Sequence, residues 1–282
     1  MKLIKPYFNI IEQQSGLDGM YKQIEMAGRT CYKSEDKITE TSAKEFVDRM
    51  IKSGHGAMLE HGTVYLFARW YQHAAGSPLS KYHDNKFSRF NTNDNGTYIT
   101  TNLRVLVENN WLDDLQYMCE PTKYHEKRYT VKFICDRGVS HEFVRHRVFS
   151  FAQESTRYCN YSKDKFGNEL TFIIPLWCNI PDNPSNEEEK KIWLGEKGSF
   201  EEKFMMHCLI AENHYNELIE LQYKPQQARA VLPNSLKTEL VMTGFESDWK
   251  HFFELRDAKS AHPQALELAS PLHQEFLTRG YL

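Results

Sequence analysis

Two strand-like runs frame a long polar segment in the first half of this 282-residue chain. Residues 63–70 and 129–136 are rich in β-branched and aromatic side chains, which is typical of strands. Residues 71–127 between them are turn-rich and polar, and only residues 102–109 and 111–117 have a helical pattern. We therefore expect 71–127 to be an insertion and the two flanking strands to pair as a hairpin.

Helix signals surround these strands. Apolar residues at helical spacing predict a helix over 17–27, and a capping box of Ser42 and Glu45 predicts another that stops at Gly54. Further helices are expected at 140–148 with Ser140 as N-cap, from the Ser199 capping box, at 249–256 and from Pro263, with short strands at 171–176 and 237–243. The chain is predicted to be a single α+β domain over 1–282, with mixed helices around a small, mostly antiparallel sheet.

Composition narrows the class of protein. Hydrophobic residues make up 40% of the chain and aromatic residues 13%, which is enough for a sizeable core. The formal net charge of −3 argues against a nucleic-acid partner, because such proteins favour a basic surface. The six cysteines are scattered without a CxxC pair, no signal peptide is evident and no apolar run approaches a membrane span, so we expect a cytoplasmic protein with reduced thiols and no membrane contact.

A cluster of hydrogen-bond donors follows the second strand, in the run RHRVFSFAQESTRY. Arg145, His146 and Arg147 are followed by Ser155 and Arg157, a set suited to a phosphate-bearing ligand. An isolated RHR triplet is more often a group of surface cations at a helix C-terminus, but the density of donors beyond it favours binding. If the triplet lies on a regular helix, its side chains point about 100° apart and must face different partners.

This run resembles the signature of the flavin-dependent thymidylate synthases. In that signature, an Arg-His-Arg triplet is followed by seven residues and then a serine, and the run from Arg145 to Ser155 has this spacing. Four further blocks resemble the family in the same order along the chain. They are residues 27–32, 54–61, 227–233 and 251–256.

The resemblance implies a homotetramer with shared active sites. It would bind FAD and make dTMP from dUMP, with methylenetetrahydrofolate as carbon donor and NADPH as reductant, and it implies no metal. The flavin would supply the hydride, so the protein would contribute placement and electrostatics. Uracil C5 must become nucleophilic, and a permanently charged guanidinium suits the negative charge that then develops on the ring.

Site residues follow from the matching positions. The resemblance implies that Arg256 is the catalytic arginine held against the pyrimidine. It implies cofactor contacts from His55, Ala57, Arg145, His146, Arg147, Gln153 and His251. It implies substrate contacts from Glu142, Arg145, Gln153, Glu154, Ser155, Thr156, Arg157, Arg229 and Arg256.

Some positions depart from the family pattern. Phe245 and Ser247 stand where family members often have Asn and Arg for flavin contact, and Glu142 stands where a neutral Gln is frequent. Nothing near Ser155 in the sequence reads as an activating base, so we expect a hydrogen-bonding role for its hydroxyl. Glu60 and His61 are expected to brace the His55 loop.

Three other functions remain open from the residues. A flavin-free thymidylate synthase needs a Pro-Cys-His motif, and the nearest string is residues 206–208, in an amphipathic helix where cysteine is usually core. A metal hydrolase lacks HxxxH spacing on any predicted helix. An RNA- or DNA-binding module built on RHR, with Phe151 and Tyr161 as stacking surfaces, conflicts with the acidic net charge, and flavin binding would discriminate it.

Overall fold

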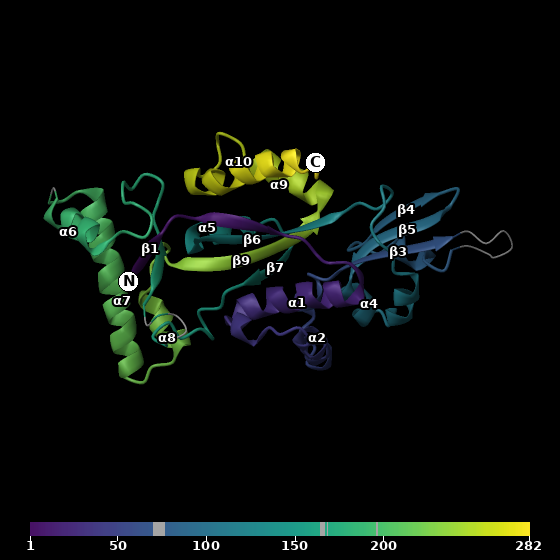
Figure 1. Cartoon of the computed structure of the whole chain (residues 1–282), viewed down its shortest axis with the longest axis horizontal. Coiled ribbons are helices and arrows are strands. Elements are labelled where there is room, and N and C mark those ends of the chain that lie inside the picture. The colour runs from purple at the N-terminus through teal and green to yellow at the C-terminus, as the bar shows by residue number, and fades with distance from the viewer. Residues whose placement is uncertain (70–76, 164–166, 168, 196) are drawn as a thin grey trace.

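The computed structural model describes residues 1–69, 77–163, 167, 169–195 and 197–282 (Figure 1). Helices and small sheets are interspersed along these ranges, which confirms the α+β class. No helix in the described ranges is both long and apolar enough to span a membrane. Trp70 and residues 71–76, at the start of the predicted insertion, lie outside the described residues.

The main sheet has four antiparallel strands in the order β2-β6-β9-β7. They are β2 (Tyr7–Ile11), β6 (Arg128–Asp136), β7 (Ser150–Gln153) and β9 (Lys237–Phe245). The two central strands pair over their full length, with Arg128 opposite Phe245 and Asp136 opposite Lys237. The first residue of β6 and the last of β9 therefore lie at the same end of the sheet.

Helices cover both faces of this sheet (Figure 1). The helices α9 (Glu246–Arg256) and α10 (Pro263–Thr278) lie on one face, and α1 (Gly16–Tyr32) lies on the other. Strand β9 serves both, because alternate side chains of a strand point to opposite faces: Leu240 packs in the α9–α10 core, and Val241 packs with Ala27 of α1. Pro271 lies inside α10 and does not split it.

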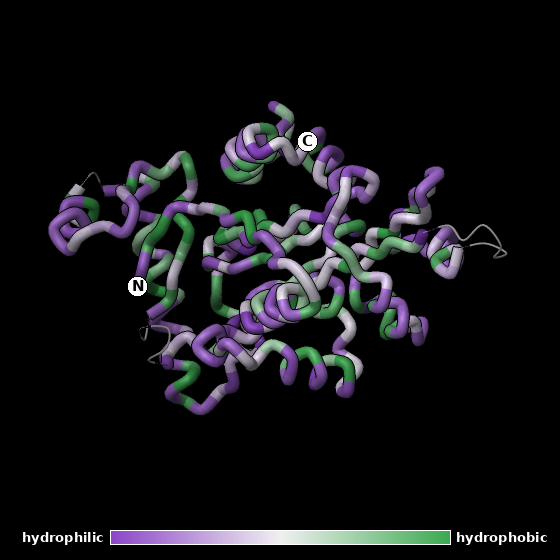
Figure 2. Tube along the Cα trace, turned by 45° about the vertical axis from the view of Figure 1, so that its right-hand side comes forward, coloured by the Kyte–Doolittle hydropathy of each residue, from purple (hydrophilic) through white to green (hydrophobic). Residues whose placement is uncertain are grey.

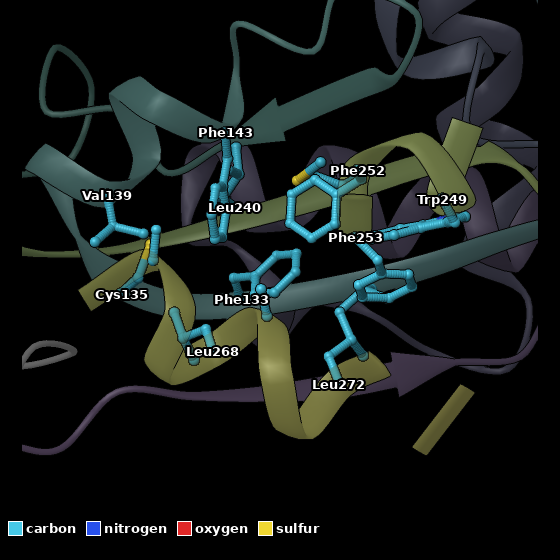
Figure 3. Packing of buried hydrophobic residues seen from close by; sticks show 14 of the residues in the cluster. Phe133, Cys135, Val139, Phe143, Leu240, Trp249, Phe252, Phe253, Leu268 and Leu272 are labelled. Atoms are coloured by element: carbon cyan, nitrogen blue, oxygen red, sulfur yellow. The ribbon is translucent and has the colours of Figure 1, made fainter. Parts of the chain in front are cut away.

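The core between the sheet and α9–α10 is largely aromatic. Figure 3 shows Phe133 of β6 among Phe143, Phe252, Phe253 and Trp249, all nearly inaccessible to solvent. Burial of each such ring contributes about 2–3 kcal/mol relative to exposure. Figure 2 shows the matching pattern along the chain, with hydrophobic positions on the central strands and hydrophilic ones on outer turns.

The predicted hairpin is wrong. Strand β3 (Thr63–Arg69) pairs with β5 (Gly96–Asn102), which also pairs with β4 (Arg89–Asn93). The other two strands of this sheet therefore come from within the segment 71–127. Strands β4 and β5 form a tight hairpin around Asp94 and Asn95. Strand β3 pairs with β5 of this hairpin, which is closer to it along the chain than β6. The partners of β6 are instead β2 and β9.

The donor triplet does not lie on a helix. Asp136, rather than Ser140, is the N-cap of α5 (Arg137–Phe143), and its carboxylate accepts from the Val139 N–H at 2.9 Å. The helix starts earlier than predicted and ends at Phe143, so residues 145–147 form a turn between α5 and β7.

Small elements surround β3 and α1. They are α2 (Ser42–Lys52), α3 (Gly56–Leu59), α4 (Leu103–Glu108) and the 3-10 helices η1 (Glu35–Lys37), η2 (Ser80–Tyr82) and η3 (Leu112–Tyr117). The predicted capping box of α2 is wrong, because Thr41 is the N-cap and the Ser42 hydroxyl donates to Glu25 at 2.8 Å.

The N-terminal strand packs with elements from the second half of the chain. Strand β1 (Lys2–Ile4) pairs in parallel with β8 (Thr171–Ile173), and the helices beside them are α6 (Asn186–Leu194), α7 (Phe200–Glu220), α8 (Pro225–Ala228) and the 3-10 helix η5 (Arg229–Val231). The N-cap of α7 is confirmed, since Ser199 accepts from the Glu202 N–H at 3.1 Å.

Candidate active site

Arg256 is the last residue of α9 and is held by three contacts at the end of α5. Its Nη1 donates to Glu142 Oε2 at 2.6 Å, its Nη2 donates to the Glu142 carbonyl at 2.8 Å, and its Nε donates to His146 Nε2 at 3.0 Å. The aromatic residues of α9 pack onto the sheet and direct its last turn toward α5. The fold thus brings together three predicted site residues from two distant segments.

His146 is a neutral acceptor in this cluster. Burial, then the nearby Arg256 and His251, lower the pKa of His146 to about 4. Because Nε2 accepts from Arg256, the ring proton is assigned to Nδ1. His251 is exposed, its ring centroid lies 6.4 Å from that of His146, and its Nδ1 lies 3.2 Å from Glu254 Oε2.

The three residues of the RHR turn face different surroundings. His146 is buried against Arg256, whereas the side chains of Arg145 and Arg147 are exposed and take part in no ion pair or side-chain hydrogen bond in the described ranges. Arg147 lines a cleft of about 650 Å³ between the three-stranded sheet β3-β5-β4 and the main sheet. We call this the insertion cleft; its lining includes Lys86, Phe87, Arg89, Arg128, Arg147 and Phe245.

Gln153, the last residue of β7, and Glu154, which follows it, are engaged within the protein. Gln153 Nε2 donates to the hydroxyls of Ser140 at 2.8 Å and Thr238 at 3.2 Å. The carboxylate of Glu154 is 1% exposed and accepts from Tyr161 at 2.9 Å. Glu154 therefore supports the following turn rather than presenting its carboxylate to a ligand.

A buried ionic network lies beneath that turn. Glu239 accepts from Lys33 at 2.6 Å and from Lys237 at 2.7 Å and forms an ion pair with Lys132, and Lys237 also donates to Glu154 at 2.8 Å. Burial alone would raise the pKa of Glu239, but the three ammonium groups lower it below its usual value. The network therefore stays charged and ties β6, β9 and α1 to the end of β7.

The turn that carries Ser155 meets a second arginine from far along the chain. The Ser155 N–H donates to the Cys31 carbonyl at 3.0 Å, and the Ser155 hydroxyl accepts from the Arg157 N–H at 3.3 Å. Arg229 at the start of η5 donates to the Thr156 hydroxyl at 3.2 Å. The next residue, Arg157, is exposed, and its Cζ lies 5.1 Å from the Tyr158 ring centroid. The fold thus brings Arg229 to the turn that carries Arg157, and guanidinium groups are suited to binding a phosphate.

The His55 loop reaches the same turn across another cleft. His55 and Ala57 are exposed at the start of α3. His55 and Tyr158 both line a cleft of about 820 Å³ that also includes Arg29, Tyr32 and Arg49. His61 braces this region, because its Nδ1 lies 2.8 Å from the Thr243 hydroxyl, and Glu60 pairs with Arg104.

The departures at 245 and 247 have a structural explanation. Phe245 is buried, with Arg89 Cζ 4.0 Å and Arg128 Cζ 5.3 Å from its ring centroid. The backbone N–H of Ser247 donates to Glu126 at 2.9 Å. Sequence reasoning missed Arg89, which lies within the predicted insertion, and Arg128, which directly follows it.

Comparison with known proteins matches this constellation to a family. Residues 97–278, more than half of the chain, match the family model described as thymidylate synthase complementing protein. The chain belongs to this family. The matched segment contains the Arg256 cluster and the Ser155 turn, and the His55 loop precedes it.

Known proteins, among them one solved structure, are similar to this chain over about half of it or more. A flavin-dependent thymidylate synthase from Corynebacterium aurimucosum is 24% identical over 254 residues, which cover 87% of this chain and 71% of the relative. One from Pyrococcus horikoshii is 30% identical over 148 residues, 52% of this chain and 54% of the relative. A UMP/dUMP methylase from Streptomyces cacaoi, solved with 5-Br dUMP, has a TM-score of 0.44 and 16% identity, covering 99% of this chain and 93% of that structure.

Proposed function

We propose that this protein is a flavin-dependent thymidylate synthase that converts dUMP to dTMP. Methylenetetrahydrofolate is the carbon donor, reduced FAD the hydride donor and NADPH the reductant. Membership of the family and the names of its relatives support the class of reaction. The Arg256 cluster is the observation that carries the residue assignment, because it holds a guanidinium in one fixed position at the end of the signature turn.

Arg256 stabilises negative charge on the pyrimidine in this proposal. Three of its five N–H groups are engaged by Glu142 and His146, which leaves two N–H groups for a ligand. A guanidinium that is oriented beforehand stabilises charge developing on the uracil carbonyls without reorganising during the reaction. Neutral His146 fixes the guanidinium without competing for the anion.

The Ser155 turn holds the nucleotide. Arg157 and Arg229 bind the phosphate beside Thr156, since two guanidinium groups match a phosphate dianion in charge and in donor geometry. The Ser155 hydroxyl hydrogen-bonds the pyrimidine. It is not assigned as a nucleophile, because its described hydrogen bond is to a backbone N–H and not to a base.

The exposed part of the RHR turn fits an anionic cofactor. The guanidinium groups of Arg145 and Arg147 have no ion-pair or side-chain hydrogen-bond partner among the described residues, and the insertion cleft beside Arg147 combines cations with aromatic rings. Arg145, Arg147 and His251 would hold FAD, together with His55 and Ala57. When bound, the flavin supplies the hydride that reduces the transferred carbon to a methyl group.

Shared active sites in a homotetramer and a cytoplasmic location complete the proposal. All six cysteines lie in the described ranges and none forms a disulfide, which agrees with a reducing compartment.

The test is product analysis. Purified protein is incubated anaerobically with dUMP, methylenetetrahydrofolate, FAD and NADPH, and nucleotides and folates are separated by chromatography. We expect dTMP and tetrahydrofolate, because the flavin rather than the folate supplies the hydride. Formation of dihydrofolate without added flavin would indicate the flavin-free route, and absence of flavin binding together with retention of single-stranded RNA would reject the synthase.

A further inference from the structure

The insertion cleft contains a partly buried cation, Arg128, that forms no ion pair with any described residue. Arg128 donates to the Glu60 carbonyl at 2.9 Å and to the Ser150 hydroxyl at 3.2 Å, but its Nε is buried without an acceptor and no ion pair of the described ranges includes it. Burial lowers the pKa of Arg128 to about 10. A partly buried charge with an unsatisfied N–H favours a partner of opposite sign, so this site points to an anionic ligand.

Two further cations of the cleft are also uncompensated. Arg147 from the RHR turn and Lys86 from the insertion form no ion pair in the described ranges. Arg89 differs, because it pairs with Glu126 at 3.0 Å and lies 3.6 Å from Asp248. The lining also includes Glu60 and Glu108, which both pair with Arg104, and Asp248 beside Arg89. Among the described lining residues, the cations that form no ion pair are therefore Lys86, Arg128 and Arg147.

Aromatic surface accompanies these charges. Phe87 is 55% exposed beside Lys86, whose Nζ lies 5.0 Å from its ring centroid. Phe245 forms a buried wall against Arg128. Cations next to an accessible ring suit a ligand that has both phosphates and an aromatic base.

We propose that the inserted segment supplies a diphosphate-binding subsite for FAD, in which Lys86 and Arg128 act together with Arg147 on the phosphates and Phe87 packs against the adenine ring. This inference rests on the proposed function. In this proposal, the segment 71–127 contributes directly to FAD affinity. The cations of the subsite replace flavin contacts that Phe245 and Ser247 do not provide.

The experiment measures the dissociation constants of FAD and dUMP for the full-length protein by calorimetric titration. The variants are K86E, R128M and the control K123E. Lys123 is a matched control because it lies in the same segment, is exposed, has its Nζ 5.1 Å from the Tyr124 ring centroid and does not line the cleft. We expect K86E and R128M to weaken FAD binding about tenfold or more, with dUMP affinity unchanged, and K123E to match the wild type.

Salt dependence gives a second readout. Removal of a phosphate contact should make FAD affinity less sensitive to added salt in K86E than in the wild type. Wild-type FAD affinity in K86E, or an equal loss in K123E, would overturn the inference. If R128M does not fold, K86E decides alone, since its side chain is exposed. A wild-type protein that binds no FAD rejects the proposed function itself, whereas unaffected variants of an active enzyme reject only this subsite.

Discussion

Glu142 and Arg256 are joined twice, through the carboxylate at 2.6 Å and through the backbone carbonyl at 2.8 Å, although 114 positions separate them. The side chains are 29% and 16% exposed, so the pair is partly shielded from solvent. The carboxylate fixes the guanidinium but also offsets its positive charge. Positioning and charge can therefore be separated by substitution.

E142Q keeps a hydrogen-bond acceptor for Arg256 and removes the negative charge. We expect the KM for dUMP to fall about threefold, because the site becomes more positive toward a dianionic nucleotide. Steady-state kinetics at low ionic strength measures this change. The control is E246Q, which removes an acidic partner of Lys250 at the other end of α9. A KM that rises in E142Q would show that the carboxylate does more for the nucleotide than position Arg256.

R256A removes the guanidinium from the cluster. We expect kcat to fall about 100-fold or more while FAD remains bound, since a fixed donor to developing charge contributes on that scale. Product formation and flavin absorbance are measured on the same preparation. R256K should recover little activity, because an ammonium group cannot make the three planar contacts of a guanidinium. Turnover near the wild-type rate in R256A would remove this residue from the reaction.

S155A tests the role of the turn hydroxyl. Loss of one hydrogen bond to the pyrimidine predicts a decrease in kcat/KM within about tenfold, with dTMP still formed. The measurement is dTMP production together with dUMP affinity. Complete loss of turnover with intact dUMP affinity would instead support a nucleophilic serine.

We expect the buried His61 to make the fold less stable at acidic pH. Burial, and then Arg128, lower the pKa of His61 to about 3, whereas the unfolded chain titrates near 6.5. Its contribution to stability is complete above pH 6.5 and is lost as the pH falls toward 3, because only the unfolded state takes up the proton in that window. Each pH unit corresponds to about 1.4 kcal/mol.

H61N removes this titration and keeps an acceptor or donor near Thr243. Between pH 7.0 and 5.0, we expect the free energy of unfolding of the wild type to decrease by about 2 kcal/mol more than that of H61N, measured by urea denaturation. The same change at exposed His207 is the control. Equal decreases in the wild type and H61N would contradict the prediction.

Local signals determined which elements could be predicted from the sequence. Ser199 and Glu202 lie three residues apart and marked the start of α7 correctly. The start of α5 was missed because Asp136 and Ser140 both suit an N-cap, and the side chain that accepts the Val139 N–H is that of Asp136. The pairing of β3 with β5 was missed because the turn at residues 94–95 was assigned to an irregular insertion.

Contacts between residues far apart in the chain could not be predicted from the sequence. The family resemblance placed Arg256 in the site, but its hydrogen bonds to Glu142 and His146 depend on how α9 packs against the sheet. Arg128 was not predicted at all, since at the start of a strand nothing in the sequence shows whether a side chain is buried.

The lysines around Glu239 have a consequence for the kinetics of nucleotide capture. They fix the end of β7, and the Glu154 N–H is bonded to the Glu239 carbonyl at 2.8 Å, so the turn at 155–157 is already ordered before a ligand arrives. A preorganised turn loses little conformational entropy on association. Weakening this network should therefore slow the association of the nucleotide, even though no lysine of the network touches it in the proposed site.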